Sequence, residues 1–276
     1  MNNHPININQ LSSDEKRKLL AELMKKKAAK SQFFPLSFAQ SRLWFLDQLD
    51  SGSSVYNLPI ALSLSGKLDI TLLEKSLNEI IKRHEILRTC FTEVKEEVFQ
   101  KVLPSLSVKL DLINFPTSVN QQEIQTYIKQ EASTKFDLTQ VPLFRSQLLK
   151  LAEDEYVLLL TMHHIISDYW SMRVLIQELA TIYQGNASAL KELPIQYVDY
   201  AVWQKNWLES TGKDAPWRVS TAYWKKQLEN HSPLLQLPTD YPRPSVPSLQ
   251  GATQYFTLTT ELSESLKTLS RREGVT

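Results

Sequence analysis

Two adjacent histidines and an aspartate stand where an apolar run ends. The run 158–162 has the composition of a buried strand, His163 and His164 follow it directly, and Asp168 lies four residues after the second histidine. Neighbouring residues on a strand point to opposite faces, so one histidine should face the interior and the other a cavity at the strand end. A histidine in that place suits a general base because its ordinary pKa lies near neutrality. The aspartate would orient that base, or would hold the turn by pairing with an arginine.

The same three residues also fit other kinds of site. The histidines could simply be packed in the core. A zinc site needs at least three well-placed ligands, and His4, His84 and His231 lie at no ligand spacing. A serine hydrolase of the Gly-x-Ser-x-Gly type and a glycine-rich phosphate loop both need closely spaced glycines, which the chain lacks. The residues alone therefore leave two interpretations open, a general base and a packed pair.

Helical and strand-like segments alternate along the whole chain without a strict βαβ repeat. This mixture predicts an α+β or mixed α/β fold, with a hairpin where residues 153–155 join two apolar runs. The expected helices cover residues 38–49, 70–84, 121–134, 171–183, 198–208, 221–229 and 261–272, and the expected strands cover residues 56–65, 87–91, 98–102, 108–113, 143–151, 156–161 and 252–258.

The first thirty residues stand apart from this pattern. Residues 12–30 predict a basic amphipathic helix that starts with Ser12 and Glu15 at capping-box spacing. We expect the segment 1–33 to be either a solvated leading helix or a docking element for a partner protein. A second boundary is the segment 233–247, which holds five prolines and predicts an irregular connector.

The composition excludes several classes of protein. The chain of 276 residues carries 31 Lys and Arg against 30 Asp and Glu, a balance that argues against a nucleic-acid binder. Cys90 is its one cysteine, so neither an internal disulfide nor a cysteine-based zinc site is expected. No apolar run reaches the roughly 18–20 residues of a membrane helix, and the N-terminus lacks the apolar core of a signal peptide. We therefore expect a soluble, cytoplasmic protein that contacts neither nucleic acid nor membrane.

The segment 163–168 resembles the HHxxxDG signature of condensation domains from nonribosomal peptide synthetases. These domains are members of the chloramphenicol acetyltransferase superfamily. Five further stretches are similar to family sequences and follow in the family's order, so the resemblance covers residues 34–276. They are residues 37–46, 83–91, 197–203, 223–228 and 237–244.

The resemblance implies a particular architecture and reaction. A family member consists of two acetyltransferase-like lobes with the active site in a tunnel between them, which here implies a first lobe over 34–186 and a connector plus an incomplete second lobe over 187–276. Donor and acceptor peptidyl carrier proteins, loaded by adenylation domains, bring thioesters on phosphopantetheine arms. The acceptor amine attacks the donor thioester and a peptide bond forms. The family implies no cofactor or metal bound by the domain itself.

The resemblance also implies a role for each site residue. His164 would be the catalytic histidine, which deprotonates the acceptor amine or positions it. His163 and Asp168 would be structural, and the carboxylate would pair with Arg83 or Arg88 of the second motif.

The chain departs from the family pattern at two places. Tyr169 stands where the signature has glycine, and a glycine there permits close backbone approach or a positive φ. A tyrosine should strain the backbone and place a ring beside the tunnel, so we expect reduced or altered catalysis unless the ring turns away.

The chain also ends before a second lobe would be complete, which predicts a fragment of a larger synthetase. Two alternatives stay open: a non-catalytic domain that docks carrier proteins, and a related acyltransferase that acts on an alcohol or amine.

One group of aromatic residues has no place in the motif chemistry. Because these aromatics recur at helical spacing, we expect them to pack in the core or between lobes. The group is Tyr197, Tyr200, Trp203, Trp207, Trp217, Tyr223 and Trp224.

Overall fold

A computed structural model describes most of the chain after the N-terminal segment. The described residues are 33–50, 53–116, 119–210, 216–232, 236–242, 244–245, 254 and 256–275. The expected helix over 12–30 lies outside them. The chain divides after His231 into two compact units, a first unit up to residue 231 and a second unit from residue 232 onward. None of the described helices is long and apolar enough to cross a membrane.

The first unit is built on a four-stranded sheet with the order β2-β7-β6-β5. Its strands are β2 (Asn57–Ser65), β5 (Asp111–Asn114), β6 (Phe144–Ala152) and β7 (Glu155–His163). The expected hairpin is confirmed, since β6 and β7 pair antiparallel with Phe144 opposite Met162. β2 pairs antiparallel on the other side of β7, with Asn57 opposite His163. β5 completes the sheet as the parallel neighbour of β6.

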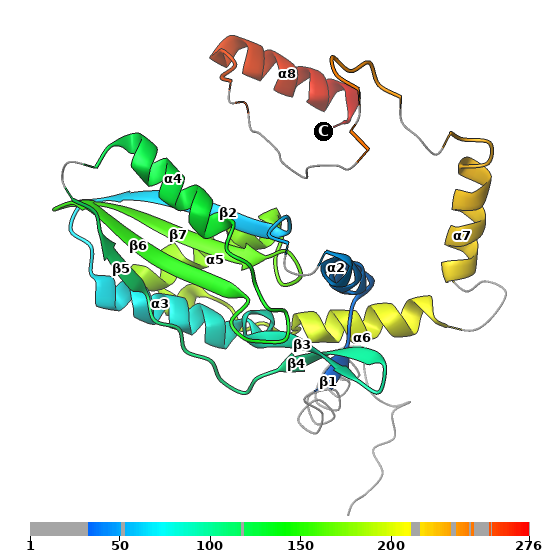
Figure 1. The fold of residues 1–276 in the computed structure, drawn as a ribbon, viewed down its shortest axis with the longest axis horizontal. Coiled ribbons are helices and arrows are strands. Elements are labelled where there is room, and N and C mark those ends of the chain that lie inside the picture. Colours follow the sequence, from blue (N-terminus) through cyan, green and yellow to red (C-terminus); the bar gives the residue numbers. More distant parts are fainter. Residues whose placement is uncertain are drawn as a thin grey trace, which may run out of the picture. The chain divides into compact units, whose positions relative to one another are not determined.

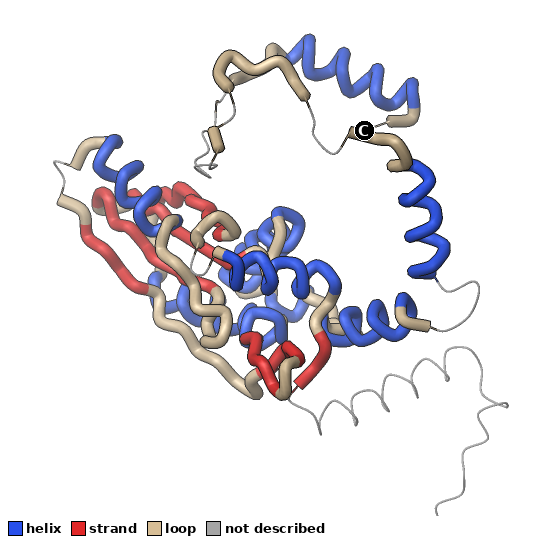
Figure 2. Tube along the Cα trace, turned by 45° about the vertical axis from the view of Figure 1, so that its right-hand side comes forward, coloured by secondary structure: helices blue, strands red, loops and turns tan. Residues whose placement is uncertain are grey.

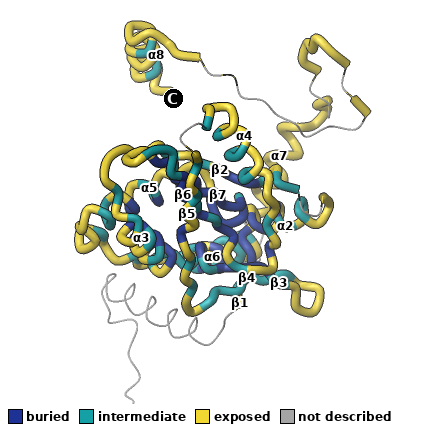
Figure 3. The backbone as a smooth tube through the Cα atoms, turned by 60° about the vertical axis from the view of Figure 1, so that its left-hand side comes forward, coloured by how far each residue is buried: buried dark blue, intermediate teal, exposed yellow. Residues whose placement is uncertain are grey.

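Helices cover both faces of this sheet (Figure 1). On one face lie α3 (Ile70–Arg83) and α5 (Tyr169–Tyr183), and on the other lies α4 (Gln121–Ala132). The alternation of side chains along the strands follows this arrangement. Leu148, Leu158 and Leu160 join the core cluster shared with α3 and α5, whereas Tyr127 of α4 hydrogen-bonds Gln147. Buried strands therefore lie at the centre of the unit, while α4 contains no buried residue (Figure 3).

A second, smaller sheet has the order β1-β4-β3. Its strands, like those of the larger sheet, are drawn in red in Figure 2. The smaller sheet contains β1 (Phe33–Pro35), β3 (Thr89–Val94) and β4 (Glu97–Val102), next to helix α2 (Phe38–Leu49). The expected strand over 87–91 is only partly right. Residues Glu85–Arg88 form a short 3-10 helix, η2, because the backbone amide of Leu87 donates back to the carbonyl of His84 over 3.1 Å.

Three helices follow the sheet region. In the first unit these are α6 (Tyr197–Leu208) and α7 (Pro216–Gln227), preceded by a 3-10 turn, η3 (Ala187–Ala189). In the second unit, α8 (Thr260–Glu273) confirms the helix expected over 261–272, and Gly274 ends it with a left-handed φ of 63°. The strand expected over 252–258 is wrong for its described part, since Gln254 and residues 256–258 lie in no strand.

The expected aromatic packing is also partly wrong. Tyr200, Trp203 and Trp207 lie 41%, 51% and 49% exposed along α6, so the core half of that expectation fails. They stack on one another instead, with the Trp203 and Trp207 ring centroids 5.5 Å apart and nearly parallel. The first compact unit continues past the boundary expected at residue 187, up to residue 231, and within it Tyr197 hydrogen-bonds Ser37. The two-lobe division itself stays a prediction.

Candidate active site

The first histidine of the motif is the last residue of β7 and is buried. His163 is 2% exposed, and the backbone amide of Ile165 donates to its Nδ1 over 3.1 Å. The rings of Tyr56 and Phe136 meet it edge-on, with centroids at 6.4 and 6.3 Å. Burial, followed by the nearby His164, lowers the pKa of His163 to about 4. His163 is therefore neutral at physiological pH and acts as a packing residue that accepts one hydrogen bond.

The second histidine turns away from this interior position. His164 is half-buried, and its backbone amide donates to the carbonyl of Tyr56 over 2.8 Å. Its Nδ1 lies 2.8 Å from the carbonyl oxygen of Ser167. A carbonyl can only accept, so Nδ1 carries the hydrogen and the lone pair of the neutral ring is on Nε2. This is the tautomer that a base acting through Nε2 requires. The expected interior histidine is His163 and the less buried one is His164, while the cavity expected in front of the second histidine stays a prediction.

The aspartate of the motif caps the helix that follows. Asp168 is the N-cap of α5, where its Oδ1 accepts from the backbone amide of Ser171 over 2.7 Å and from the Ser171 hydroxyl over 2.6 Å. These hydrogen bonds, chiefly the one from the hydroxyl, lower the pKa of Asp168. The carboxylate of Asp168 therefore fixes the turn between His164 and α5 by bonding to the first turn of α5, the helix that it caps.

The expected ion pair between Asp168 and an arginine is wrong. Arg83 donates from Nε to both carboxylate oxygens of Glu178 at 3.2 Å, and from Nη2 to the Lys191 carbonyl at 2.6 Å. Arg88 donates to the Leu103 carbonyl at 2.6 Å and pairs with Glu85. Glu178 follows Asp168 by ten residues, roughly 15 Å along α5, so an arginine bound there cannot also reach the N-cap.

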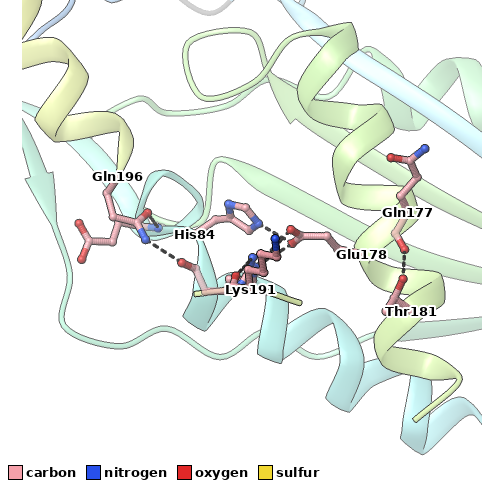
Figure 4. Close-up of polar contacts among 8 residues, drawn as sticks. His84, Gln177, Glu178, Thr181, Lys191 and Gln196 are labelled. Atoms are coloured by element: carbon pink, nitrogen blue, oxygen red, sulfur yellow. Dashed lines mark hydrogen bonds and ion pairs between the residues drawn. The ribbon is translucent and has the colours of Figure 1, made fainter. Parts of the chain in front are cut away.

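Glu178 organises a buried polar cluster that sequence reasoning missed (Figure 4). It is 9% exposed, and one of its carboxylate oxygens lies 2.6 Å from Nε2 of His84. Gln196, just before α6, joins the cluster by donating to the Arg83 carbonyl and accepting from the Glu85 amide. A signal was present, since Glu178 lies on the same helical face as the buried Leu175 and Leu179. A carboxylate on a buried apolar face of a helix requires a positively charged or hydrogen-bonding partner.

Tyr169 does not strain the backbone as expected. It is the first residue of α5, and among the described non-glycine residues only Lys95, Glu96 and Asn230 have a positive φ. The first helical position takes an ordinary right-handed conformation, which a tyrosine adopts without cost. Its side chain is 81% exposed, and that of Trp170 is 75% exposed. Two large aromatic side chains therefore stand at the helix start, directly after the motif.

A cavity of about 420 Å³ lies between α2 and the loop after α4. Trp44, Asp47 and Gln48 line it from α2, and residues 135–139 line it from the loop. Burial, together with the negative charges of Asp137 and Asp50, raises the pKa of Asp47. Phe136, which lines this cavity, also meets the buried His163 edge-on. Within the described residues, no three His, Cys, Asp or Glu side chains lie together in a way that could hold a metal ion.

The fold and the motif geometry define a class of protein, and comparison with known families agrees. The condensation domain family matches residues 30–276, and the chain belongs to that family. It is 44% identical over 254 residues to a linear gramicidin synthase polypeptide of Brevibacillus parabrevis. The aligned region covers 90% of this chain and 3% of that protein. It is 40% identical to a plipastatin synthase polypeptide of Bacillus subtilis (strain 168), over 91% of this chain and 7% of that protein.

The solved structures that resemble this chain have the same fold. The X-domain from teicoplanin biosynthesis superimposes with a TM-score of 0.74 at 28% identity, over 90% of this chain and 54% of that one. A four-domain nonribosomal peptide synthetase, holo-AB3403, superimposes with a TM-score of 0.72 at 22% identity, over 88% of this chain and 18% of that one. The chloramphenicol acetyltransferase-like fold is thereby confirmed. The chain spans a few per cent of the synthetases that it matches in sequence.

Proposed function

We propose that this chain is a condensation domain that forms a peptide bond between two carrier-bound aminoacyl or peptidyl thioesters. The observation that carries the proposal is the 2.8 Å contact between Nδ1 of His164 and the carbonyl oxygen of Ser167. Because a carbonyl can only accept, the hydrogen lies on Nδ1 and the lone pair on Nε2 can meet an ammonium or amine group. Membership of the condensation domain family supports the same reaction.

In the proposed reaction, the α-amine nitrogen of the acceptor attacks the carbonyl carbon of the donor thioester. A C–N bond forms, the C–S bond breaks, and the donor arm leaves as a thiolate. Nε2 of His164 takes the proton that the attacking nitrogen must lose and passes it to the departing sulfur, so the products are an amide and a free thiol. The Ser167 carbonyl holds the ring and stabilises the imidazolium that forms in between.

The partners follow from the substrates. Both thioesters would arrive on the phosphopantetheine arms of peptidyl carrier proteins, which adenylation domains of the same cytoplasmic assembly line would load. His163 and Asp168 would support the reaction indirectly, since His163 packs beneath the loop and Asp168 caps α5. Arg83 and Arg88 would support it at a greater distance, through the Glu178 cluster and the Leu103 carbonyl.

The test is a reconstituted condensation. The chain is mixed with one carrier protein loaded with a donor aminoacyl group and a second loaded with an acceptor, and the acceptor carrier is analysed by mass spectrometry. We expect a dipeptidyl thioester with the unmodified chain and none with His164→Ala. Equal product with His164→Ala would contradict the proposal.

A non-catalytic docking role is the second candidate. The observation that favours it is the exposed pair Tyr169 and Trp170, which offers a partner a large aromatic contact beside the motif. The X-domain from teicoplanin biosynthesis, which has a similar fold, has been solved in complex with OxyB. Carrier binding without any dipeptidyl product, in the same assay, would favour docking. Product formed with a free alcohol or amine in place of the acceptor carrier would instead favour a related acyltransferase.

A further inference from the structure

A buried pair of carboxamides lies behind the turn that carries His164. Gln40 of α2 is 1% exposed and Gln100 of β4 is fully buried. The two side chains meet over 2.9 Å, from Nε2 of Gln40 to Oε1 of Gln100. Gln40 also donates from Nε2 to the carbonyl of Ile165, at 3.4 Å. Residues from α2, β4 and the motif turn, far apart in the sequence, are thus joined by one amide.

The orientation of the Gln40 amide follows from its partners. Its Oε1 accepts from the backbone amide of Ser37 over 2.9 Å, and an N–H can only donate. The Nε2 hydrogens must therefore point the other way, toward Gln100 and Ile165. Gln100 is fixed in turn, because its own Nε2 donates to the Pro35 carbonyl over 2.9 Å. The two carboxamides consequently have one consistent arrangement.

Ile165 belongs to the short turn that joins His164 to Ser167. The Ser167 carbonyl accepts from Nδ1 of the His164 ring, so the position of this turn decides how the ring is held. The turn is otherwise held from the β7 side, where the Ile165 and Ile166 amides donate to His163 at 3.1 and 3.0 Å. Ile165 is 3% exposed, so its carbonyl depends on a protein donor rather than on bulk solvent.

We propose that Gln40 is a positioning residue for His164 and acts by holding the Ile165 carbonyl from the α2 side. A displacement of that carbonyl moves Ser167 relative to His164, which loosens the Nδ1 hydrogen bond and the direction of Nε2. The inference rests on the proposed function only in treating His164 as the base, since the placement of the ring can be measured without substrate.

The experiment compares Gln40→Met with a matched control, Asn78→Leu. Asn78 of α3 is also a carboxamide that bonds distant backbone, as donor to the Val108 carbonyl and acceptor from the Val108 amide, but it has no link to the motif turn. The readout is the ¹⁵N spectrum of the His164 ring. We expect Gln40→Met to shift the ring resonances and to expose Nδ1–H to faster solvent exchange, whereas Asn78→Leu leaves both as in the unmodified chain.

An unchanged His164 ring in folded Gln40→Met would overturn the proposal, as would an equal change in Asn78→Leu. A measurement on the unmodified chain decides the case even if Gln40→Met does not fold. There we expect nuclear Overhauser contacts from the Gln40 side-chain amide hydrogens to the α-hydrogen of Ile166, because the α-carbon of Ile166 lies on the same side of the trans peptide as the Ile165 carbonyl oxygen, and their absence would also overturn it. Where the condensation assay is active, kcat should fall about tenfold to a hundredfold in Gln40→Met with KM unchanged. An inactive unmodified chain would count against the proposed function alone.

Discussion

At the scale of single residues, His163 and His164 are neighbours in the chain with opposite surroundings. His163 is closed in by Tyr56 and Phe136 and accepts from a backbone amide. His164 donates to a carbonyl and keeps its lone pair on Nε2. The alternation along a strand predicted this separation, but which histidine is the interior one depends on how neighbouring elements pack against the end of β7 and could not be read from the local sequence.

The buried His163 should make stability pH-dependent. Its pKa falls from an ordinary 6.5 to about 4 in the folded chain, so between these values the unfolded chain binds a proton that the folded chain does not. Its contribution is therefore fully present above pH 6.5, is lost as the pH falls toward 4, and amounts to about 3 kcal/mol. We expect His163→Asn, whose Oδ1 can still accept from Ile165, to have a flatter profile of unfolding free energy between pH 6.5 and 4 by urea titration. Parallel profiles for the two chains would contradict this.

Tyr169 is the second prediction at this scale. Its backbone is unstrained, so any effect on catalysis must come from its exposed ring. We expect Tyr169→Gly to raise the rate of condensation, measured in a chimera that carries residues 34–186 in a two-lobed condensation domain. Tyr169→Phe is the matched control, because it keeps the ring, and should stay at the unmodified rate. An unchanged condensation rate in Tyr169→Gly would show that the Tyr169 ring does not hinder catalysis.

At the scale of elements, most segments could be predicted and their polar partners could not. Helix α3 and the β6–β7 hairpin follow directly from apolar periodicity and a short acidic turn. The pairing of Arg83 was misjudged, because a resemblance between motifs carries no distances. The carboxylate that pairs with Arg83 depends on how α3 packs against α5. This packing brings Glu178, and not Asp168, within hydrogen-bonding distance of Arg83.

A double-mutant cycle tests the corrected pairing. Glu178 and Arg83 are largely buried, with side chains 12% and 18% exposed, so removing one partner leaves the other's charge uncompensated at a cost of about 3–5 kcal/mol. We expect Glu178→Gln and Arg83→Met to couple by about 1–3 kcal/mol in unfolding free energy. Asp168→Asn with Arg83→Met should be additive within about 0.5 kcal/mol. Strong coupling of Asp168 with Arg83 would restore the ion pair that the structure lacks.

The helix cap at Asp168 gives a separate prediction. Replacing it with alanine removes the acceptor for both Ser171 donors and should lower the unfolding free energy by about 1 kcal/mol, while Asp168→Ser should retain most of the stability. Urea titration at neutral pH measures both variants. Equal losses in the two would show that Asp168 acts other than as a cap.

At the scale of the whole molecule, the family could be predicted from six short stretches in the right order. The match over residues 30–276 and the TM-score of 0.74 to a related domain confirm that prediction. What those stretches could not predict is the surface on α6, where aromatics expected to be buried stack in the open. Apolar composition identifies residues that prefer to pack against other apolar side chains. It does not predict whether they are buried in the core of the first unit or stack on its surface, as the α6 aromatics do.

The central claim is that Nε2 of His164 serves the bond-forming step while His163 only supports the loop. A single-turnover rate of dipeptidyl thioester formation, with both carriers pre-loaded, separates the two roles because loading and release no longer contribute. We predict a loss of about a hundredfold or more for His164→Ala, in keeping with general base catalysis, and a rate within about tenfold of the unmodified chain for His163→Asn. A similar loss in both variants, or the larger loss in His163→Asn, would contradict the account.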